Sequence, residues 1–366
     1  MSANSQQRIL DGSSWSDFCD RLKQTGEVIL REASPDDPFD RAEGFRYLSR
    51  LVRVALESYI EAADPRAPVL RRPSHETVKI GADNPDNYYQ SAAVSGEYEY
   101  RLFGTRGTVH YLGFGTYAGN YGSGGRMGQS GYLDAADMEI AADGSFEVIL
   151  GCRERVGNWL RMEPDTSSLI VRQTFEDRSQ EKIADLHIER FDAGEAPEPI
   201  TPEFIDEGLA AAANYVFGTA SLFTDWSESF AEHPNELPFF DPAIAKAAHG
   251  DPNILYYHGY WELKSEEALV VDVTPPACEY WNFQVNNYWM ESLDYRYHRI
   301  AVNHHDAVAE SDGSVRLVLA HRDPGLPNWL ETAGHERGTM CLRWVRAKEN
   351  PVPRVRVVPF SDLSAL

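Results

Sequence analysis

The chain has 366 residues, of which 42% are hydrophobic and 11% aromatic, so it is long enough for two domains with packed cores. Its 57 acidic residues outnumber 34 basic ones, and the resulting net charge of -23 argues against nucleic acid or an anionic membrane as a partner. The N-terminus has no signal-peptide pattern, and no apolar run reaches the roughly 18 residues of a membrane span, so we expect a cytoplasmic protein.

Helical periodicity occupies the first part of the chain. Apolar residues recur at helical spacing from Trp15 to Tyr59, until the prolines of "ADPRAPVLRRP" end the pattern. Residues 1–75 are therefore predicted to form an N-terminal helical region. Residues 76–180 are predicted to form a first β-sandwich module, because they contain short segments rich in β-branched and aromatic residues, among them "EYEYRLFG", "TVHYLGFGTY", "SFEVILGC" and "SSLIVRQTF".

A second helical segment begins at Thr201-Pro202, which suits the N-cap and first turn of a helix. Residues 181–250 are therefore predicted to be a helical linker region. Strand-like segments return after it, from "ILYYHGYWEL" through "EYWNFQV" and "TMCLRWVRA" to "RVRVVP". Residues 251–366 are predicted to form a second β-sandwich module.

The two predicted modules are similar to each other in sequence. An offset of 169 residues aligns Tyr111 with Tyr280 and Phe114 with Phe283, and one added residue aligns two Asn-Trp-Leu triplets. We interpret this register as an internal duplication. It predicts that Trp159 and Trp329 occupy equivalent buried positions.

The C-terminal module resembles a bacterial family known as domain of unknown function 1214. The resemblance rests on "EYWNFQVNNYWMES" and on Asp-Gly-Ser followed by Pro-x-x-Asn-Trp-Leu, and it is best over residues 250–360. Members of this family are often paired with domain of unknown function 1254. The resemblance implies jelly-roll β-sandwiches and no particular reaction. The predicted fold class is α+β and predominantly β, with two tandem jelly-roll-like modules, an N-terminal helical region and a helical linker.

Two polar, aromatic segments are the main candidates for a site. "ADNPDNYYQ" and "NNYWMESLDYRYHR" combine aromatic walls with carboxylates, as binding and acid–base chemistry on a small molecule require, although core packing is the alternative interpretation. We predict that both segments converge on one pocket with the glycine-rich stretch 113–131, a candidate flap. The candidate catalytic residues are Tyr89, Asp86, Glu291, Asp294, His298 and His335. The candidate ligand-binding residues are Asn87, Tyr88, Tyr117, Tyr121, Asn287, Trp289, Tyr295, Arg296 and Arg322.

No metal or cofactor is predicted, because the histidines lack ligand spacing and the glycine-rich stretch does not lead into a helix. A metal assembled from His258, His298, His321 and His335 stays open as an alternative. The leading hypothesis is a cofactor-independent acid–base enzyme, a lyase, isomerase or hydrolase, acting on a small, partly hydrophobic or polyhydroxylated metabolite. A non-catalytic protein that binds a small molecule or carbohydrate is the second hypothesis, and an assembly protein is the third. Homo-oligomer formation also stays open.

Overall fold

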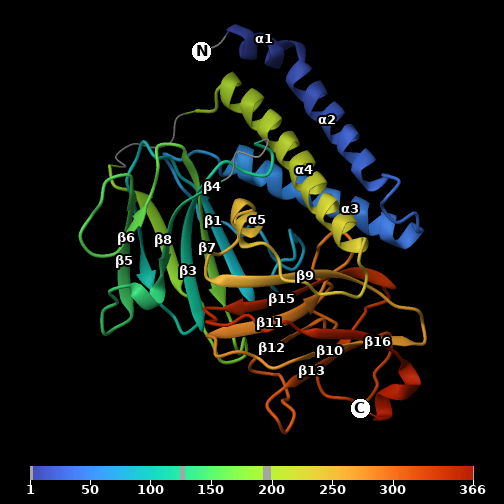
Figure 1. Ribbon diagram of the computed structural model, residues 1–366. Coiled ribbons are helices and arrows are strands. Elements are labelled where there is room, and N and C mark those ends of the chain that lie inside the picture. Colours follow the sequence, from blue (N-terminus) through green and yellow to red (C-terminus); the bar gives the residue numbers. More distant parts are fainter. Residues whose placement is uncertain (1–2, 124–127, 193–198, 366) are drawn as a thin grey trace.

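The computed structural model describes residues 3–123, 128–192 and 199–365, which form a helical layer and two β modules (Figure 1). The helical layer contains α1 (Ala3–Asp11), α2 (Ser13–Ile29), α3 (Pro38–Leu56) with a π-helical extension η1 (Glu57–Glu61), and α4 (Pro202–Ala231). Helix α4 lies against α2 and α3, and Tyr47, Leu51 and Val216 belong to their common core. The Thr201 side chain accepts a hydrogen bond from the Phe204 backbone, so the predicted start of this helix is confirmed.

The first β module consists of two four-stranded sheets with the orders β1-β7-β3-β4 and β6-β5-β2-β8. Leu102 and Val148 from one sheet share an apolar core with Phe114 and Val171 from the other. The strands are β1 (Asn87–Ala93), β2 (Tyr100–Thr105), β3 (Tyr111–Ala118), β4 (Gly128–Asp134), β5 (Ser145–Gly151), β6 (Trp159–Arg161), β7 (Thr166–Thr174) and β8 (Asp185–Arg190), with a short helix η2 (Ala135–Asp137) after β4.

The second β module has sheets with the orders β12-β11-β15-β9 and β14-β13-β10-β16. Its core contains Leu269 and Leu317 from one sheet and Phe283 and Leu342 from the other. The short helix α5 (Pro242–Ala247) precedes β9 (Ile254–Glu262), which is followed by β10 (Glu267–Val273), β11 (Tyr280–Val285), β12 (Ala301–Asn303), β13 (Val315–Ala320), β14 (Trp329–Glu331), β15 (Arg337–Val345), β16 (Arg354–Pro359) and η3 (Phe360–Ala365).

The two Asn-Trp-Leu triplets have matching surroundings. Each tryptophan begins a short strand that is parallel to its neighbour. The indole of Trp159 donates to the Gly151 carbonyl at 3.1 Å, and that of Trp329 donates to the Ala320 carbonyl at 3.1 Å. Both tryptophans are only half-buried, which corrects the prediction of buried rings. The leucines that follow them, Leu160 and Leu330, are the side chains that enter the cores.

The chain is thus mostly β with N-terminal helices, and its first module extends further than the sequence predicts. Strand β8 belongs to that module although it lies beyond the predicted boundary at residue 180. The sequence also does not predict strand β1, because its polar residues favour a site segment instead. Within the described ranges, none of the helices is both long enough and apolar enough to cross a membrane.

The two modules meet through reciprocal contacts, in which a strand of each module contacts the segment that precedes the first strand of the other. At the start of β3, the Tyr111 hydroxyl donates to Asp251 at 3.1 Å, and at the start of β11 the Tyr280 hydroxyl donates to Asp86 at 2.5 Å. Asn253 also contacts the Tyr111 hydroxyl, at 3.3 Å, and Asn84 contacts that of Tyr280, at 3.5 Å. The outer faces of the sheets that contain β1 and β9 are thereby brought together beside α4.

Candidate functional site

A cavity of about 490 Å³ lies where the two β modules meet helix α4. Its walls come from β1, β7, β9 and β15, from α4 and α5, and from the segments 80–84, 119–121 and 248–250. The volume falls within the range of small-molecule sites. Its lining combines aromatic rings with buried polar groups, and we treat it as the candidate site.

Strand alternation places the polar side chains of β1 in this cavity. Asn87, Tyr89 and Ser91 line it, whereas the intervening Tyr88 packs against the core of the first module. Tyr89 is paired with Arg172 across β1 and β7. Paired residues of antiparallel strands lie on the same face, so Arg172 also borders the cavity.

The second module contributes an equivalent arginine. Arg343 on β15 is paired with Tyr256 on β9 and with Asn282 on β11, and both Arg343 and Tyr256 line the cavity. The Arg343 guanidinium donates to Gln284 at 2.6 Å, to Asn282 at 3.3 Å and to the Ala82 carbonyl. These neutral acceptors hold the group in place without neutralising its charge.

Arg172 is held in the same way. Its guanidinium donates to the Tyr117 hydroxyl at 2.9 Å and to the His249 carbonyl at 2.5 Å. The nearby carboxylates have other partners, because Asp251 accepts from Tyr111 and Tyr132, and Asp83 accepts from Ser292. Across the described part of the chain, no carboxylate lies within ion-pair distance of Arg172 or Arg343.

Arg71 is the third arginine of the cavity. It is mostly buried, and burial lowers the pKa of its guanidinium. Its Nε and Nη1 atoms have no hydrogen-bond partner among the described residues, although buried donors are usually paired. The neighbouring groups that act on its charge are Tyr215, Glu57 and Tyr59.

An aromatic wall connects the surroundings of Arg71 with those of Arg172. Successive ring centroids are 5.5 Å apart from Tyr59 to Tyr215, 6.1 Å from there to Tyr121, 5.7 Å on to His249 and 4.7 Å on to Tyr117. Tyr117 then contacts Arg172. The cavity thus has aromatic surface between two separate cationic regions.

The two histidines of the cavity are neutral at physiological pH. Burial, with a smaller contribution from the charge of Arg172, lowers the pKa of His249 to about 4. Burial, with a smaller contribution from the charge of Arg343, lowers that of His258 to about 3. Burial likewise raises the pKa of Tyr89 and of Tyr256. His249 Nε2 and His258 Nδ1 have no hydrogen-bond partner within the described ranges.

The first predicted site segment and the glycine-rich stretch reach the cavity in part. Asn87, Tyr89 and Tyr121 line it, and Tyr117 positions Arg172. Asp86 lies outside, where it accepts hydrogen bonds from Tyr280 and from Asn303 at 3.1 Å.

The sequence predicts the glycine-rich stretch as a candidate flap. Most of its described residues lie instead in two paired antiparallel strands. Residues 113–118 lie in β3 and residues 128–131 in β4. Residues 124–127 lie outside the described residues.

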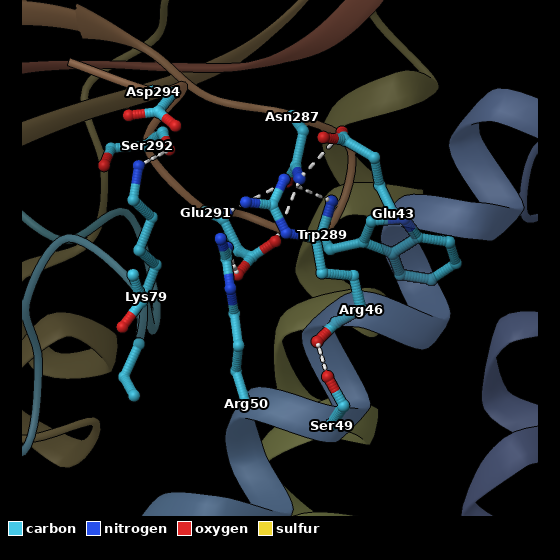
Figure 2. Close-up of polar contacts among 12 residues, drawn as sticks. Glu43, Arg46, Ser49, Arg50, Lys79, Asn287, Trp289, Glu291, Ser292 and Asp294 are labelled. Carbon is cyan, nitrogen blue, oxygen red and sulfur yellow. Dashed lines mark hydrogen bonds and ion pairs between the residues drawn. The ribbon is translucent and has the colours of Figure 1, made fainter. Parts of the chain in front are cut away.

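The 287–292 loop, in the second predicted segment, packs against α3 instead (Figure 2). Asn287 donates to Glu43 at 3.0 Å and to Glu291 at 3.1 Å, and the Trp289 indole donates to the Asp40 carbonyl at 2.8 Å. Arg50 of α3 forms a 2.5 Å ion pair with Glu291. Trp289 and Glu291 are almost fully buried outside the cavity, which corrects the expectation that Trp289 shares a pocket with Tyr89.

The rest of that segment and the remaining predicted residues form separate contacts away from the cavity. Asp294 pairs with Arg296 at 2.7 Å, the Tyr295 ring lies 4.7 Å from the Lys79 ammonium, and His298 contacts Glu331 at 2.9 Å. His335 contacts Glu43 at 2.6 Å, and Arg322 pairs with the exposed Glu266 at 2.7 Å. The predicted convergence of His298 with Tyr89 is therefore wrong.

Sequence reasoning missed the three arginines and the helix α4 residues Tyr215, Phe223 and Trp226, which also line the cavity. A usable signal was present, because Arg172 and Arg343 interrupt the apolar strands "SSLIVRQTF" and "TMCLRWVRA". A charged side chain inside such a strand is costly to bury unless it has a partner. An unpaired one is therefore a candidate for a functional residue.

The four histidines considered for a metal site do not come together. His298 and His335 pair with different glutamates, and His321 contacts Thr332 at 3.0 Å. His258 lies among the aromatic rings of Phe230 and Phe240. In the described part of the chain one group has the spacing of metal ligands, formed by His110, Glu176 and Glu181.

The fold and cavity define a two-module, mostly β protein with a cavity of ligand size. Residues 265–349 match the model of a family described as "Protein of unknown function (DUF1214)". The second β module therefore contains a domain of this family. It is 54% identical to an uncharacterized protein from Burkholderia cenocepacia, whose crystal structure matches 98% of this chain and 99% of that chain with a TM-score of 0.96.

A structure of a Vibrio parahaemolyticus protein is 10% identical, covering 86% of this chain and 98% of that chain with a TM-score of 0.49. No curated protein matches the chain.

Proposed function

We propose that the protein binds a small organic anion, with an apolar or aromatic body, in the cavity between its two β modules. The observation that carries this proposal is the presence of Arg172 from one β module and Arg343 from the other in the lining of the cavity, each without a carboxylate partner among the described residues. An uncompensated buried charge is destabilising, and an anionic ligand would supply the missing counter-charge.

The chemistry of the lining favours a carboxylate or a similarly compact anion. Guanidinium groups offer paired N–H donors that match two oxygens of one acid group. Tyr89 and Tyr256 lie beside both arginines and add hydroxyl groups. Arg71, at the other end of the aromatic wall, has two nitrogens available for a second polar group of the ligand.

The enclosed position of the arginines favours a small ligand over a polyanion. The chain as a whole carries a net charge of -23. A negatively charged surface repels nucleic acids and anionic lipids, whereas a small anion has only to enter the cavity. The ligand body would contact the rings of Tyr121, Tyr215 and Phe223.

Matched pairs of acid and amide test this proposal. Isothermal titration calorimetry of the full chain would use benzoate, phenylacetate and 3-phenylpropionate, each beside its uncharged amide. We expect at least one acid to bind and its amide to bind at least about tenfold more weakly, because a hydrogen bond to a charged group contributes about 1.5–3 kcal/mol. Equal binding of acid and amide, or no binding by any acid at millimolar concentration, would refute the proposal.

The arginines provide the variants for the same experiment. Arg71→Gln is the first choice, because its Nε and Nη1 have no partner to lose. Arg172→Gln removes the donor that faces Tyr117. Both should weaken binding of the acid, whereas Arg322→Gln, which removes an exposed ion pair with Glu266, should leave the affinity unchanged.

Acid–base catalysis on the bound anion is the second candidate. The observation in its favour is that His258 Nδ1 borders the cavity region without a hydrogen-bond partner, so it could accept a proton. Its pKa of about 3 makes it a weak base at neutral pH, and this favours binding over catalysis. Turnover of the bound acid that is lost in His258→Gln would support the enzyme hypothesis.

We also propose that the modules are jelly-roll-like β-sandwiches related by tandem duplication. Support comes from the common strand order, in which β1 to β8 correspond one by one to β9 to β16, and from the matched contacts of Trp159 and Trp329. Superposition of the first eight strands on the last eight tests this relationship, and a mismatch in their connections would contradict it.

A further inference from the structure

We propose a binding site for a divalent first-row metal ion, of the Zn²⁺ type, at the junction of the two modules, formed by His110, Glu176, Glu181 and His304. It is separate from the cavity and does not depend on the proposed ligand. His110 precedes β3, Glu176 and Glu181 follow β7, and His304 follows β12 in the other module. A metal ion there would connect the two modules.

The ligand atoms of three of these residues already converge. One ligand atom each from His110, Glu176 and Glu181 lie within 4.8 Å of one another. His110 Nδ1 is 2.9 Å from Glu176 Oε2, and His304 Nε2 contacts the other oxygen of the same carboxylate. Ligands of Zn²⁺ lie about 2.0–2.2 Å from the ion, which places them about 3–3.5 Å apart in a tetrahedral site.

A backbone contact orients His110 as a ligand. Its Nε2 lies 2.8 Å from the carbonyl of Glu279, which can only accept a hydrogen bond, so Nε2 carries a proton. Nδ1 is then the nitrogen that offers a lone pair in the neutral ring, and it faces Glu176. Metal-bound histidines are typically held by such a hydrogen bond from the other ring nitrogen.

The composition of the group decides which ion it would prefer. Metal ligands bind in their deprotonated forms, so two carboxylates and two imidazoles would present two negative charges, which a divalent cation would balance. Mixed nitrogen and oxygen ligands suit zinc and its neighbours, whereas Mg²⁺ and Ca²⁺ prefer oxygen ligands alone. His298 and Glu331 form a simple pair for comparison, with His298 Nδ1 also 2.9 Å from the carboxylate. Among the described residues, this pair is not part of a group of three or more possible metal ligands.

An imidazolium–carboxylate pair is the competing explanation, and titration with metal separates the two. Calorimetry would follow Zn²⁺ binding to the full chain after chelator treatment, in the background Cys19→Ser/Cys152→Ser, because both cysteines are exposed and thiolates bind zinc. Co²⁺ absorption would report the coordination geometry. We expect one ion per chain, and a midpoint of thermal unfolding that rises with the metal concentration.

The variants identify the site. Glu176→Gln and Glu181→Gln should each weaken Zn²⁺ affinity by at least about tenfold, while His298→Ala should leave it unchanged. Circular dichroism checks that each variant is folded, and His110→Ala gives a second route if Glu176→Gln is not. The proposal would be overturned, leaving an ordinary ion pair, if the parent protein did not bind Zn²⁺. It would also be overturned if His298→Ala and Glu176→Gln lowered the Zn²⁺ affinity equally.

Discussion

Arg172 and Arg343 occupy the same ladder position in two sheets of matching strand order. Arg172 is paired with Gly113 on β3 and Arg343 with Asn282 on β11, and the 169-residue offset aligns these two partners. Each arginine also faces a tyrosine on the neighbouring edge strand, Tyr89 or Tyr256. The candidate site therefore uses one arginine from each module, and neither module alone contains it.

Trp289 is predicted to stabilise the fold without taking part in ligand binding. Its ring is 1% exposed, and its indole donates to the Asp40 carbonyl of α3. Trp289→Ala should lower the free energy of unfolding by about 3–5 kcal/mol, measured by urea denaturation. Trp15→Ala removes a ring that is 60% exposed and should cost far less. Similar losses in the two variants would contradict this assignment.

The buried pair of Arg50 and Glu291 gives a double-mutant prediction. Loss of one partner leaves an uncompensated charge in the interior, so Arg50→Met alone should cost about 3–5 kcal/mol. Adding Glu291→Met removes the second charge and should recover part of the loss. Chemical denaturation of the wild type, both single variants and the double variant measures the coupling. Additive losses would show that the pair contributes no interaction of its own.

The Glu43–His335 contact predicts a pH-dependent stability. Burial lowers the pKa of His335, but the hydrogen bond and charge of Glu43 raise it more, so the net pKa is above 6.5. Burial raises the pKa of Glu43, but His335 lowers it more, so the net pKa is below 4.5. The contribution of His335 is complete below pH 6.5 and is lost as the pH rises through its folded pKa. That of Glu43 is present above pH 4.5 and is lost on acidification.

The stabilisation by this pair should therefore be greatest between pH 4.5 and 6.5. The free energy of unfolding of the wild type should exceed that of Glu43→Gln by about 1–3 kcal/mol in this window. The difference should shrink as the pH is raised above it. Denaturation of both proteins across the pH range measures it, and a difference that does not change with pH would argue that His335 stays neutral.

Substitution by alanine should have opposite effects on the free energy of unfolding at two helical glycines. A Cβ atom on Gly218 of α4 would lie 2.0 Å from the Tyr121 carbonyl oxygen, so Gly218→Ala must displace the loop that carries Tyr121 into the cavity. We expect a loss of about 1–3 kcal/mol in unfolding free energy. Gly26 of α2 has no atom within 4 Å of that position, so Gly26→Ala should gain about 0.5–1 kcal/mol. Thermal and urea unfolding compare the two, and equal effects would contradict the close packing at Gly218.

Much of the secondary structure could be predicted from local pattern. The long strands β3, β5, β7, β9 and β15 are rich in apolar, aromatic or β-branched residues, and the sequence predicts a strand in each of these segments. Strand β1 was not, because "NYYQSAA" buries one face in the core while its other face carries the polar lining of the cavity. The sequence of a strand that borders a polar cavity therefore lacks the clear apolar pattern by which a strand is predicted.

The candidate site was harder to predict because it is assembled from distant segments. Tyr89 and Tyr121 were found as polar aromatic residues, but their neighbours Arg172, Arg343 and Tyr215 lie far away in the sequence. Trp289 and Glu291 attracted attention as polar aromatic sequence, yet they attach the second module to α3.

The position of the arginines inside an acidic protein has a kinetic consequence. An anion that approaches a chain of net charge -23 is repelled until it enters the cavity. Salt at physiological strength screens such long-range repulsion beyond about 8 Å, but it acts much less on buried contacts. Association of an anion with the cavity should therefore become faster as salt is added, while its dissociation rate changes little, and stopped-flow measurements at two salt concentrations would separate these rates.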